Sequence, residues 1–295
     1  MTFQLQLTQL DTYCRIQFPA MASLCELLLD TTDTELALKL GLLAREETWR
    51  IERKFSRYRD DNPVYRINHS RGEPVELDNE TADLIDFSSQ LYDMSEGRFD
   101  ITSGLLRKVW TFDGSDRVPK SKAVKALLPK IGWSKVHWER PLLRLPEGME
   151  IDLGGVGKEY AVDKVFGLVQ SCFSGALLVN FGGDLRAQGP RADGSAWQVG
   201  VEETEAGQGP SRIELNTGAI ATSGDSQRYL LKDGVRYSHI LDPRSGWPVR
   251  NAPHAVTVFA PTCVQAGVFS TLALMMGAEA ETFLNQQHVK FWCQR

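Results

Sequence analysis

The 295-residue chain lacks the features of a membrane, nucleic-acid-binding or disulfide-rich protein. Its five cysteines are odd in number, widely spaced and without a Cys-x-x-Cys pair, which favours reduced, mostly buried thiols. No charge-free apolar run reaches the roughly 18 residues that cross a bilayer, so no membrane span is expected. The net charge of −5 is small and acidic, which argues against a nucleic-acid or membrane-surface partner.

Targeting signals are also missing from the first residues. Met1–Thr12 does not show a basic start followed by an apolar run, and no cysteine follows such a run. We therefore expect neither a secretory signal nor a lipoprotein anchor, and the chain is predicted to be cytoplasmic.

Four helices are predicted by periodicity and capping residues. Apolar side chains recur at helical spacing from Ala37 to Phe55. A second helix is expected from its cap at Asp78 to about Ser95. A third opens at residues 154–158, and a fourth begins after Thr262 and ends at Gly277.

Extended segments are expected mainly in the second half of the chain. Asp233–Gly234 predicts a hairpin turn. Another hairpin is expected between residues 142–145 and 149–153. Because strands and helices do not alternate regularly, the predicted class is α+β. The remaining strands are expected at residues 15–29 (two segments), 177–180, 185–187, 197–202, 212–215, 229–232, 235–240 and 254–260.

Several short segments carry residues suited to chemistry, although each also has an ordinary structural explanation. Residues 151–158 run through glycines into a helix, where backbone amides favour a phosphate, but a tight turn explains them equally well. Residues 180–184 favour a simple turn between strands. Asp100 suits a local cap, and Thr271 suits core packing or a bond within its helix. His239 could act as a general base, or belong to a structured turn.

The order of these segments resembles the ApbE family, the FAD:protein FMN transferases. The Asp-Leu-Gly-Gly, Thr-Ser-Gly-Asp and His-x-x-Asp-Pro-x-x-Gly segments occur together, and the resemblance covers about residues 18–284. It implies one two-lobed α+β domain over residues 1–295, with an N-terminal extension of about residues 1–14 and an FAD cleft between a mixed sheet and helices. The matching segments are residues 21–23 (less closely), 55–58 with Asn68, 97–100, 151–160, 182–184, 222–225 and 239–246.

The resemblance also implies a set of site residues by position. Met21 and Tyr58 would pack on the isoalloxazine ring, and Asp152 would hydrogen-bond the adenine. The implied catalytic residues are His239, Thr222 and Ser223. The implied cofactor-binding residues are Met21, Tyr58, Arg98, Phe99, Asp100, Asp152, Gly155, Lys158, Gly183, Asp184 and Ile240.

The implied reaction moves FMN from FAD to a threonine in an Asp-x-x-Thr stretch of a partner protein. The threonine hydroxyl attacks the FMN-side phosphorus of the diphosphate, and AMP leaves. A hydroxyl is a poor nucleophile and the diphosphate is anionic, so the site needs a base and a cation, which is Mg²⁺ in this family.

The chain departs from the family pattern at the metal site. The carbonyl of Gly155 and the side chain of Thr271 match two implied ligands, but the aspartate position is Gly267 and the second optional aspartate is Ser270. Glu159 also replaces the glycine that usually follows the lysine. We therefore expect weak Mg²⁺ binding without FAD, and tighter binding after Gly267→Asp. An FAD-binding carrier or assembly factor that has lost transfer, and an Mg²⁺-dependent FAD pyrophosphatase, are the alternatives.

Overall fold

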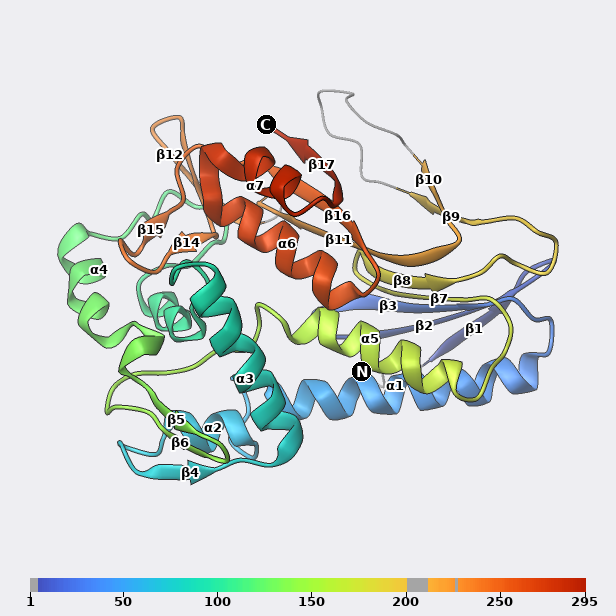
Figure 1. Cartoon of the computed structure of the whole chain (residues 1–295), viewed down its shortest axis with the longest axis horizontal. Helices are drawn as coiled ribbons and strands as arrows, with labels where there is room; N and C mark the ends of the chain where they lie inside the picture. Colours follow the sequence, from blue (N-terminus) through green and yellow to red (C-terminus); the bar gives the residue numbers. More distant parts are fainter. Residues whose placement is uncertain (1–4, 201–211, 226–227) are drawn as a thin grey trace.

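The computed structural model describes residues 5–200, 212–225 and 228–295 and is built on one eight-stranded sheet (Figure 1). Every strand pairing in this sheet is antiparallel, which corrects the expected mixed sheet. Two-residue turns join β2 to β3 and β7 to β8, and such short turns require antiparallel neighbours. In spatial order the strands are β1 (Gln6–Gln9), β2 (Cys14–Ala20), β3 (Ser23–Leu29), β7 (Leu177–Phe181), β8 (Asp184–Gln188), β11 (Thr217–Gly224), β16 (Ala255–Ala260) and β17 (Lys290–Gln294).

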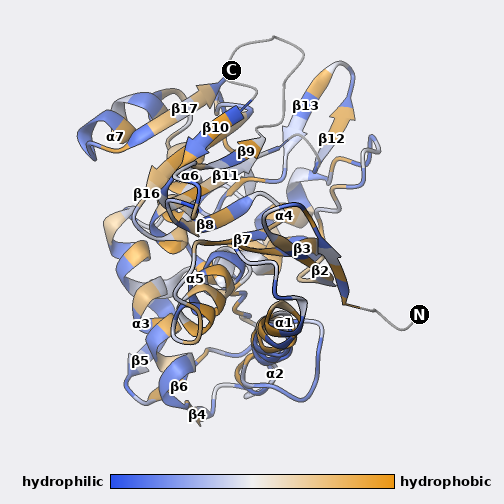
Figure 2. Ribbon diagram, turned by 90° about the vertical axis from the view of Figure 1, so that its right-hand side faces the viewer, coloured by the Kyte–Doolittle hydropathy of each residue, from blue (hydrophilic) through white to orange (hydrophobic). Residues whose placement is uncertain are grey.

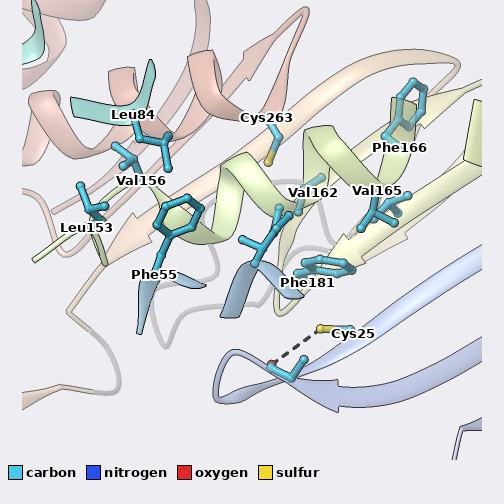
Figure 3. Close-up of a cluster of buried hydrophobic side chains, with 14 of the residues drawn as sticks. Cys25, Phe55, Leu84, Leu153, Val156, Val162, Val165, Phe166, Phe181 and Cys263 are labelled. Carbon is cyan, nitrogen blue, oxygen red and sulfur yellow. Dashed lines mark hydrogen bonds between the residues drawn. The ribbon is translucent and has the colours of Figure 1, made fainter. Parts of the chain in front are cut away.

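Three helices cover one face of the sheet: α1 (Thr34–Phe55), α5 (Gly157–Gln170) and α6 (Cys263–Met276). Helix α1 packs on β2, α5 on β7 and β8, and α6 on β11 and β16. In Figure 3, Val162 and Val165 of α5 lie over Phe181 of β7. All the inner positions expected for α1 are buried, so the apolar periodicity correctly predicted the buried face of this helix.

The opposite face carries a smaller apolar cluster under the ribbon of β9 (Trp197–Gly200) and β10 (Arg212–Leu215). Trp197 is buried there against the sheet. The central strands β3 and β7 are coloured mainly as hydrophobic in Figure 2; β7 is buried at four of its five positions, whereas β3 alternates between buried and more exposed residues. Strand β9 was expected to reach Glu202, but residues 201–211 lie outside the described part of the chain.

A second lobe is built from helix α3 (Asn79–Met94) and many short elements. As expected, Asp78 caps α3, because its carboxylate accepts hydrogen bonds from the backbone amides of Glu80 and Thr81. The other elements of this lobe are α2 (Pro63–Asn68), β4 (Pro74–Glu76), η1 (Ile101–Lys108), α4 (Ser121–Leu127), η2 (Leu128–Lys130), η3 (Trp133–Lys135), β5 (His137–Glu139), β6 (Leu142–Arg144), β12 (Tyr229–Lys232), β13 (Val235–Ser238), β14 (Leu241–Asp242) and β15 (Trp247–Pro248).

The hairpin expected between residues 142–145 and 149–153 is wrong. Strand β6 pairs with β4 and β5 instead. Residues 149–153 run through the core, where the Asn68 side chain donates to the Ile151 carbonyl (3.0 Å) and accepts from the Ile151 amide (2.7 Å). A side chain therefore replaces the partner strand that the pattern suggested.

Both ends of the chain add strands that periodicity did not predict. Strand β1 lies within the expected N-terminal extension and pairs with β2, and β17 pairs with β16. After α6 the chain passes through η4 (Gly277–Glu279) and α7 (Ala280–Gln286). The five cysteines are free, and Cys14, Cys25 and Cys263 are buried, as expected.

One helical stretch, Cys263–Gln286, is long and apolar enough to cross a membrane when judged by length and composition alone. This differs from the expectation drawn from the sequence. Half of its apolar window is buried in the protein, because α6 packs on β11 and β16. The core helix of a protein outside the membrane meets the same criterion, so this is weak evidence for a span.

Candidate functional site

One cleft of about 2360 Å³ collects nearly all the expected site residues. Ordinary ligand pockets occupy roughly 300–1,000 Å³, so this cleft has room for an extended dinucleotide and part of a second molecule. The expected residues that line it are Met21, Tyr58, Phe99, Asp100, Asp152, Gly155, Lys158, Gly183, Asp184, Thr222, Ser223, His239, Ile240 and Thr271.

Arg98 is the exception and does not line this cleft. It lies in a separate pocket of about 560 Å³ beside Asp242 and Arg244. Its guanidinium donates to the Ser95 carbonyl (3.3 Å) and contacts the Glu96 carboxylate (3.0 Å). The turn that ends α3 therefore directs Arg98 away from the path expected for FAD.

Two hairpin turns meet at one wall of the cleft. Met21 and Ala22 have φ values of 52° and 56°, which are costly for residues other than glycine. The neighbouring turn is Gly182–Gly183, which confirms the simpler expectation for this segment. A Cβ atom on Gly182 would lie 2.8 Å from the Cβ of Ser23, so glycine allows the two turns to touch. The Met21 amide donates to Glu52 (2.8 Å), which fixes the first turn.

At another wall, Arg57 organises two expected FAD contacts. Its guanidinium pairs with the carboxylate of Asp152 and donates to the hydroxyl of Tyr58 (2.8 Å). Asp152 also accepts from the Gly154 amide (3.0 Å), while Tyr58 is 83% exposed. A Cβ on Gly104 would lie 2.5 Å from the Cβ of Asp152, so η1 approaches this carboxylate only because residue 104 is glycine. Arg57 belongs to residues 55–58, one of the segments that resemble the family, but no role was predicted for it.

Asp100 acts as the local cap that the sequence offered as its simpler explanation. It is buried, and its carboxylate accepts from the amide and hydroxyl of Thr102 (2.8 and 2.6 Å) and from the Trp133 amide (3.0 Å). Burial raises the pKa of Asp100, and these hydrogen bonds oppose the rise. Its neighbour Phe99 packs on the glycine turn, because a Cβ on Gly155 would lie 3.2 Å from the Phe99 ring.

Lys158 and Asp184 form an ion pair at the start of α5. Their Nζ and Oδ2 atoms are 2.7 Å apart, and the other oxygen of Asp184 accepts from the Thr222 amide (3.2 Å). Burial raises the pKa of Asp184, and the positive charge of Lys158 opposes this rise. The ammonium therefore has a carboxylate partner before any ligand arrives.

His239 is held in one tautomer. Its Nδ1 atom lies 3.1 Å from the Arg228 carbonyl oxygen, which can only accept a hydrogen bond. Nδ1 must therefore carry the proton, which leaves the lone pair on Nε2. Burial, followed by the charge of Arg228, lowers the pKa of His239 below the usual 6.5. The neutral imidazole is thus the form present at pH 7.

An ion pair fixes the hairpin that precedes His239. Asp225 accepts from Nε and Nη2 of Arg236 (3.2 and 3.1 Å), whose guanidinium carbon lies 3.7 Å from the centre of the Tyr229 ring. This pair joins the end of β11 to the β12–β13 hairpin, whose turn at Asp233 and Gly234 is the one expected.

A cluster of hydroxyl groups connects β11 with α6. The Oγ atom of Ser223 lies 2.8 Å from Oγ of Ser270 and 2.9 Å from Oγ1 of Thr271. Ser270 donates back to the Gly267 carbonyl (3.0 Å), whereas Thr271 contacts Ser223 across the elements. Thr222, on the neighbouring position of β11, contacts the hydroxyl of Thr257 (2.9 Å).

The Glu159 side chain fills the space beside Gly267. A Cβ built on Gly267 would lie 2.6 Å from Cγ and 2.7 Å from Oε1 of Glu159. Burial, and then the charge of Asp184, raise the pKa of Glu159. Within residues 5–200, 212–225 and 228–295, no group of three or more His, Cys, Asp or Glu side chains is placed to hold a metal. A cation bound near Gly267 would therefore be held mainly by hydroxyl, carbonyl and phosphate oxygens, with few carboxylate ligands.

Comparison with known proteins gives a consistent result. The sequence model of the ApbE family matches residues 10–292. An FAD:protein FMN transferase of Vibrio cholerae is 33% identical over 78% of this chain and 71% of its own length. The ApbE protein of Thermotoga maritima has a similar structure, with a TM-score of 0.85, 30% identity and coverage of 95% and 94% of the two chains. The apo flavinyl transferase ApbE of Pseudomonas stutzeri has a TM-score of 0.82, with 26% identity and coverage of 99% and 92%.

Proposed function

The chain belongs to the ApbE family, and we propose that it is an FAD:protein FMN transferase that attaches FMN to a threonine of a partner protein and releases AMP. One observation carries the proposal. His239 lines the cleft with its lone pair on Nε2, in the company of the residues that match the family's FAD site. The cleft is also large enough for FAD and a segment of an acceptor.

In the proposed reaction, Nε2 of His239 accepts the proton of the acceptor threonine. The threonine oxygen forms a bond to the FMN-side phosphorus, the bond from that phosphorus to the bridging oxygen breaks, and AMP leaves with that oxygen. The lowered pKa of His239 keeps the imidazole neutral and able to take the proton at pH 7. The exposed Thr222 hydroxyl and the Ser223 hydroxyl are donors for phosphate oxygens in the same cleft.

The donors around Thr271 fit a hard cation such as Mg²⁺. The side-chain hydroxyl of Thr271 and the backbone carbonyl of Gly155 belong to residues that line the cleft, and both are oxygen donors. When bound there, Mg²⁺ would supply positive charge to the diphosphate of FAD. The acceptor is expected to present its threonine in a short Asp-x-x-Thr stretch.

The proposal is tested by incubating the protein with FAD, Mg²⁺ and an acceptor that carries an Asp-x-x-Thr stretch. Intact mass measurement should show the acceptor gaining one FMN group in phosphodiester linkage, and an acceptor with alanine in place of the threonine should gain nothing. Release of FMN and AMP without acceptor labelling would point instead to an FAD pyrophosphatase. Tight FAD binding with neither reaction would point to a carrier.

A further inference from the structure

We propose that Glu159 supplies the carboxylate of the cation site, in place of the side chain that Gly267 lacks. This inference rests on the proposed function, since it concerns the cation that accompanies FAD. Positions 159 and 267 both depart from the family pattern, and the proposal explains both departures together. The carboxylate would come from Glu159 on α5 and not from residue 267 on α6.

The contact between the two residues supports this exchange. A Cβ on Gly267 would lie 2.6, 2.7 and 2.9 Å from Cγ, Oε1 and Cδ of Glu159, distances that real Cβ atoms do not show. The space that a side chain on residue 267 would enter therefore already holds the Glu159 carboxyl group. Glycine at 267 leaves room for this group, so the two residues fit each other.

Residues that carry oxygen donors line the same cleft as this carboxyl group. Gly267 precedes Thr271 by four residues on α6, so both lie on the same face of the helix. Thr271 contacts Ser223 through its hydroxyl (2.9 Å). Glu159, Thr271, Ser223 and Gly155 all line the same cleft. A carboxylate, hydroxyls and a backbone carbonyl are the ligand types that Mg²⁺ prefers.

Other nearby carboxylates are already paired. Asp184 is bound to Lys158 at 2.7 Å, and Asp225 is bound to Arg236 at 3.1 Å. In the described part of the chain, Glu159 forms no ion pair with a lysine, arginine or histidine. The Glu159 carboxyl group is therefore available to an added cation at the start of α5.

The test measures Mn²⁺, an EPR-visible substitute for Mg²⁺, with FAD present and absent. Glu159→Gln keeps the shape of the side chain and removes its charge, so it should weaken Mn²⁺ binding at least about tenfold. Glu73→Gln removes the same charge from an exposed position and serves as the matched control, with Mn²⁺ affinity expected to equal that of the parent.

A swap of the two positions gives a second test that does not depend on the first variant folding well. Gly267→Asp alone should bring little gain in Mn²⁺ affinity, less than about threefold, because the new side chain can enter only by displacing the carboxyl group of Glu159 that it would replace. This revises the expectation that Gly267→Asp by itself strengthens the site. The double change Glu159→Gly with Gly267→Asp should restore Mn²⁺ affinity to within about threefold of the parent.

The proposal is overturned if Glu159→Gln binds Mn²⁺ as tightly as the parent, if the parent binds no Mn²⁺ even with FAD, or if Gly267→Asp alone tightens Mn²⁺ binding by more than about tenfold. The mass assay on the parent protein separates this inference from the proposed function. A parent that transfers FMN, with a Glu159→Gln variant of unchanged Mn²⁺ affinity, removes only the inference. A parent that fails to transfer FMN, with Mn²⁺ affinity lost in Glu159→Gln, removes only the proposed function.

Discussion

A single hydrogen bond, from Nδ1 of His239 to the Arg228 carbonyl, directs the free lone pair of His239 to Nε2. A base acts mainly in the transition state, so removing it should affect turnover much more than substrate binding. We predict that His239→Ala lowers the rate of FMN transfer by roughly 10²–10⁴-fold while FAD affinity changes little. Stopped-time mass assays and flavin fluorescence titration measure the two quantities. A variant that transfers FMN at the parental rate would show that His239 is a turn residue.

The pKa of His239 also predicts how the rate of FMN transfer falls at low pH. Because burial and Arg228 lower the pKa of His239 below 6.5, the fraction of neutral base rises as pH increases through a value below 6.5. We expect kcat/KM for FMN transfer to rise with pH, with its midpoint below 6.5, and to be level near pH 7. A midpoint above 6.5, or an unchanged acid limb in His239→Ala, would contradict the assignment.

The sequence indicated which residues gather at the cleft, but not their contacts. Asp152, Asp184 and His239, which the motifs indicated, all line the cleft, and their roles there stay predictions. Arg98 does not line the cleft, because the direction of its side chain depends on the turn that ends α3. The contact between Glu159 and Gly267 joins residues 108 positions apart on two helices, and only tertiary packing reveals it.

At the scale of elements, Glu80 on α3 connects three helices. Its carboxylate accepts two hydrogen bonds from Arg50 and one from Lys54 on α1 (each 2.7 Å), and one from the hydroxyl of Tyr160 on α5 (2.8 Å). We predict that Glu80→Gln lowers the free energy of unfolding by roughly 1–2 kcal/mol at pH 7, a value that allows for partial solvent screening. Chemical denaturation measures it. A change below about 0.5 kcal/mol, the usual range for surface substitutions, would show that the network contributes little.

This effect should depend on pH in a defined direction. Hydrogen bonds from Arg50 first, then Lys54 and Tyr160, lower the pKa of Glu80 from 4.5 to about 2. A lowered pKa in the folded state stabilises the protein above the unfolded value, and this contribution is lost as pH falls through the folded value. The difference in stability between parent and Glu80→Gln should therefore be full above pH 4.5 and shrink as pH falls toward about 2. A constant difference across that window would contradict the assignment.

Elements with local signals were predictable, and elements that depend on distant partners were not. Helices α3 and α6 carry both an apolar periodicity and a predicted capping residue, and their ends match the expectation, whereas α1 was predicted from periodicity alone and begins at Thr34, before the expected apolar face. Strand β11 lies between β8 and β16, but its sequence was interpreted only as a chemical motif. The expected hairpin at residues 142–153 failed because the Asn68 side chain, far away in sequence, satisfies the Ile151 backbone.

At the scale of the whole molecule, the sheet and the part of the second lobe around α3 and β6 share one core, whereas η1, α4 and β12–β15 pack around a second cluster. Buried residues from the sheet (Ile16), α1 (Ile51), α3 (Leu84), β6 (Leu143) and α5 (Val162) belong to a single contiguous cluster. We predict one cooperative thermal transition, with calorimetric and van't Hoff enthalpies in agreement at about 200 kcal/mol. Differential scanning calorimetry measures both. Two resolved transitions would show that the lobes unfold independently and would contradict the single-domain organisation.

The contact between Glu159 and Gly267 also makes these two positions interdependent. The flexible end of the Glu159 side chain occupies the space that a side chain on residue 267 would enter, so the free-energy effect of a change at one position depends on the residue at the other. A double-mutant cycle over Glu159→Gly and Gly267→Asp should therefore give a coupling energy different from zero. A substitution scored at either position alone would misjudge the effect of the pair.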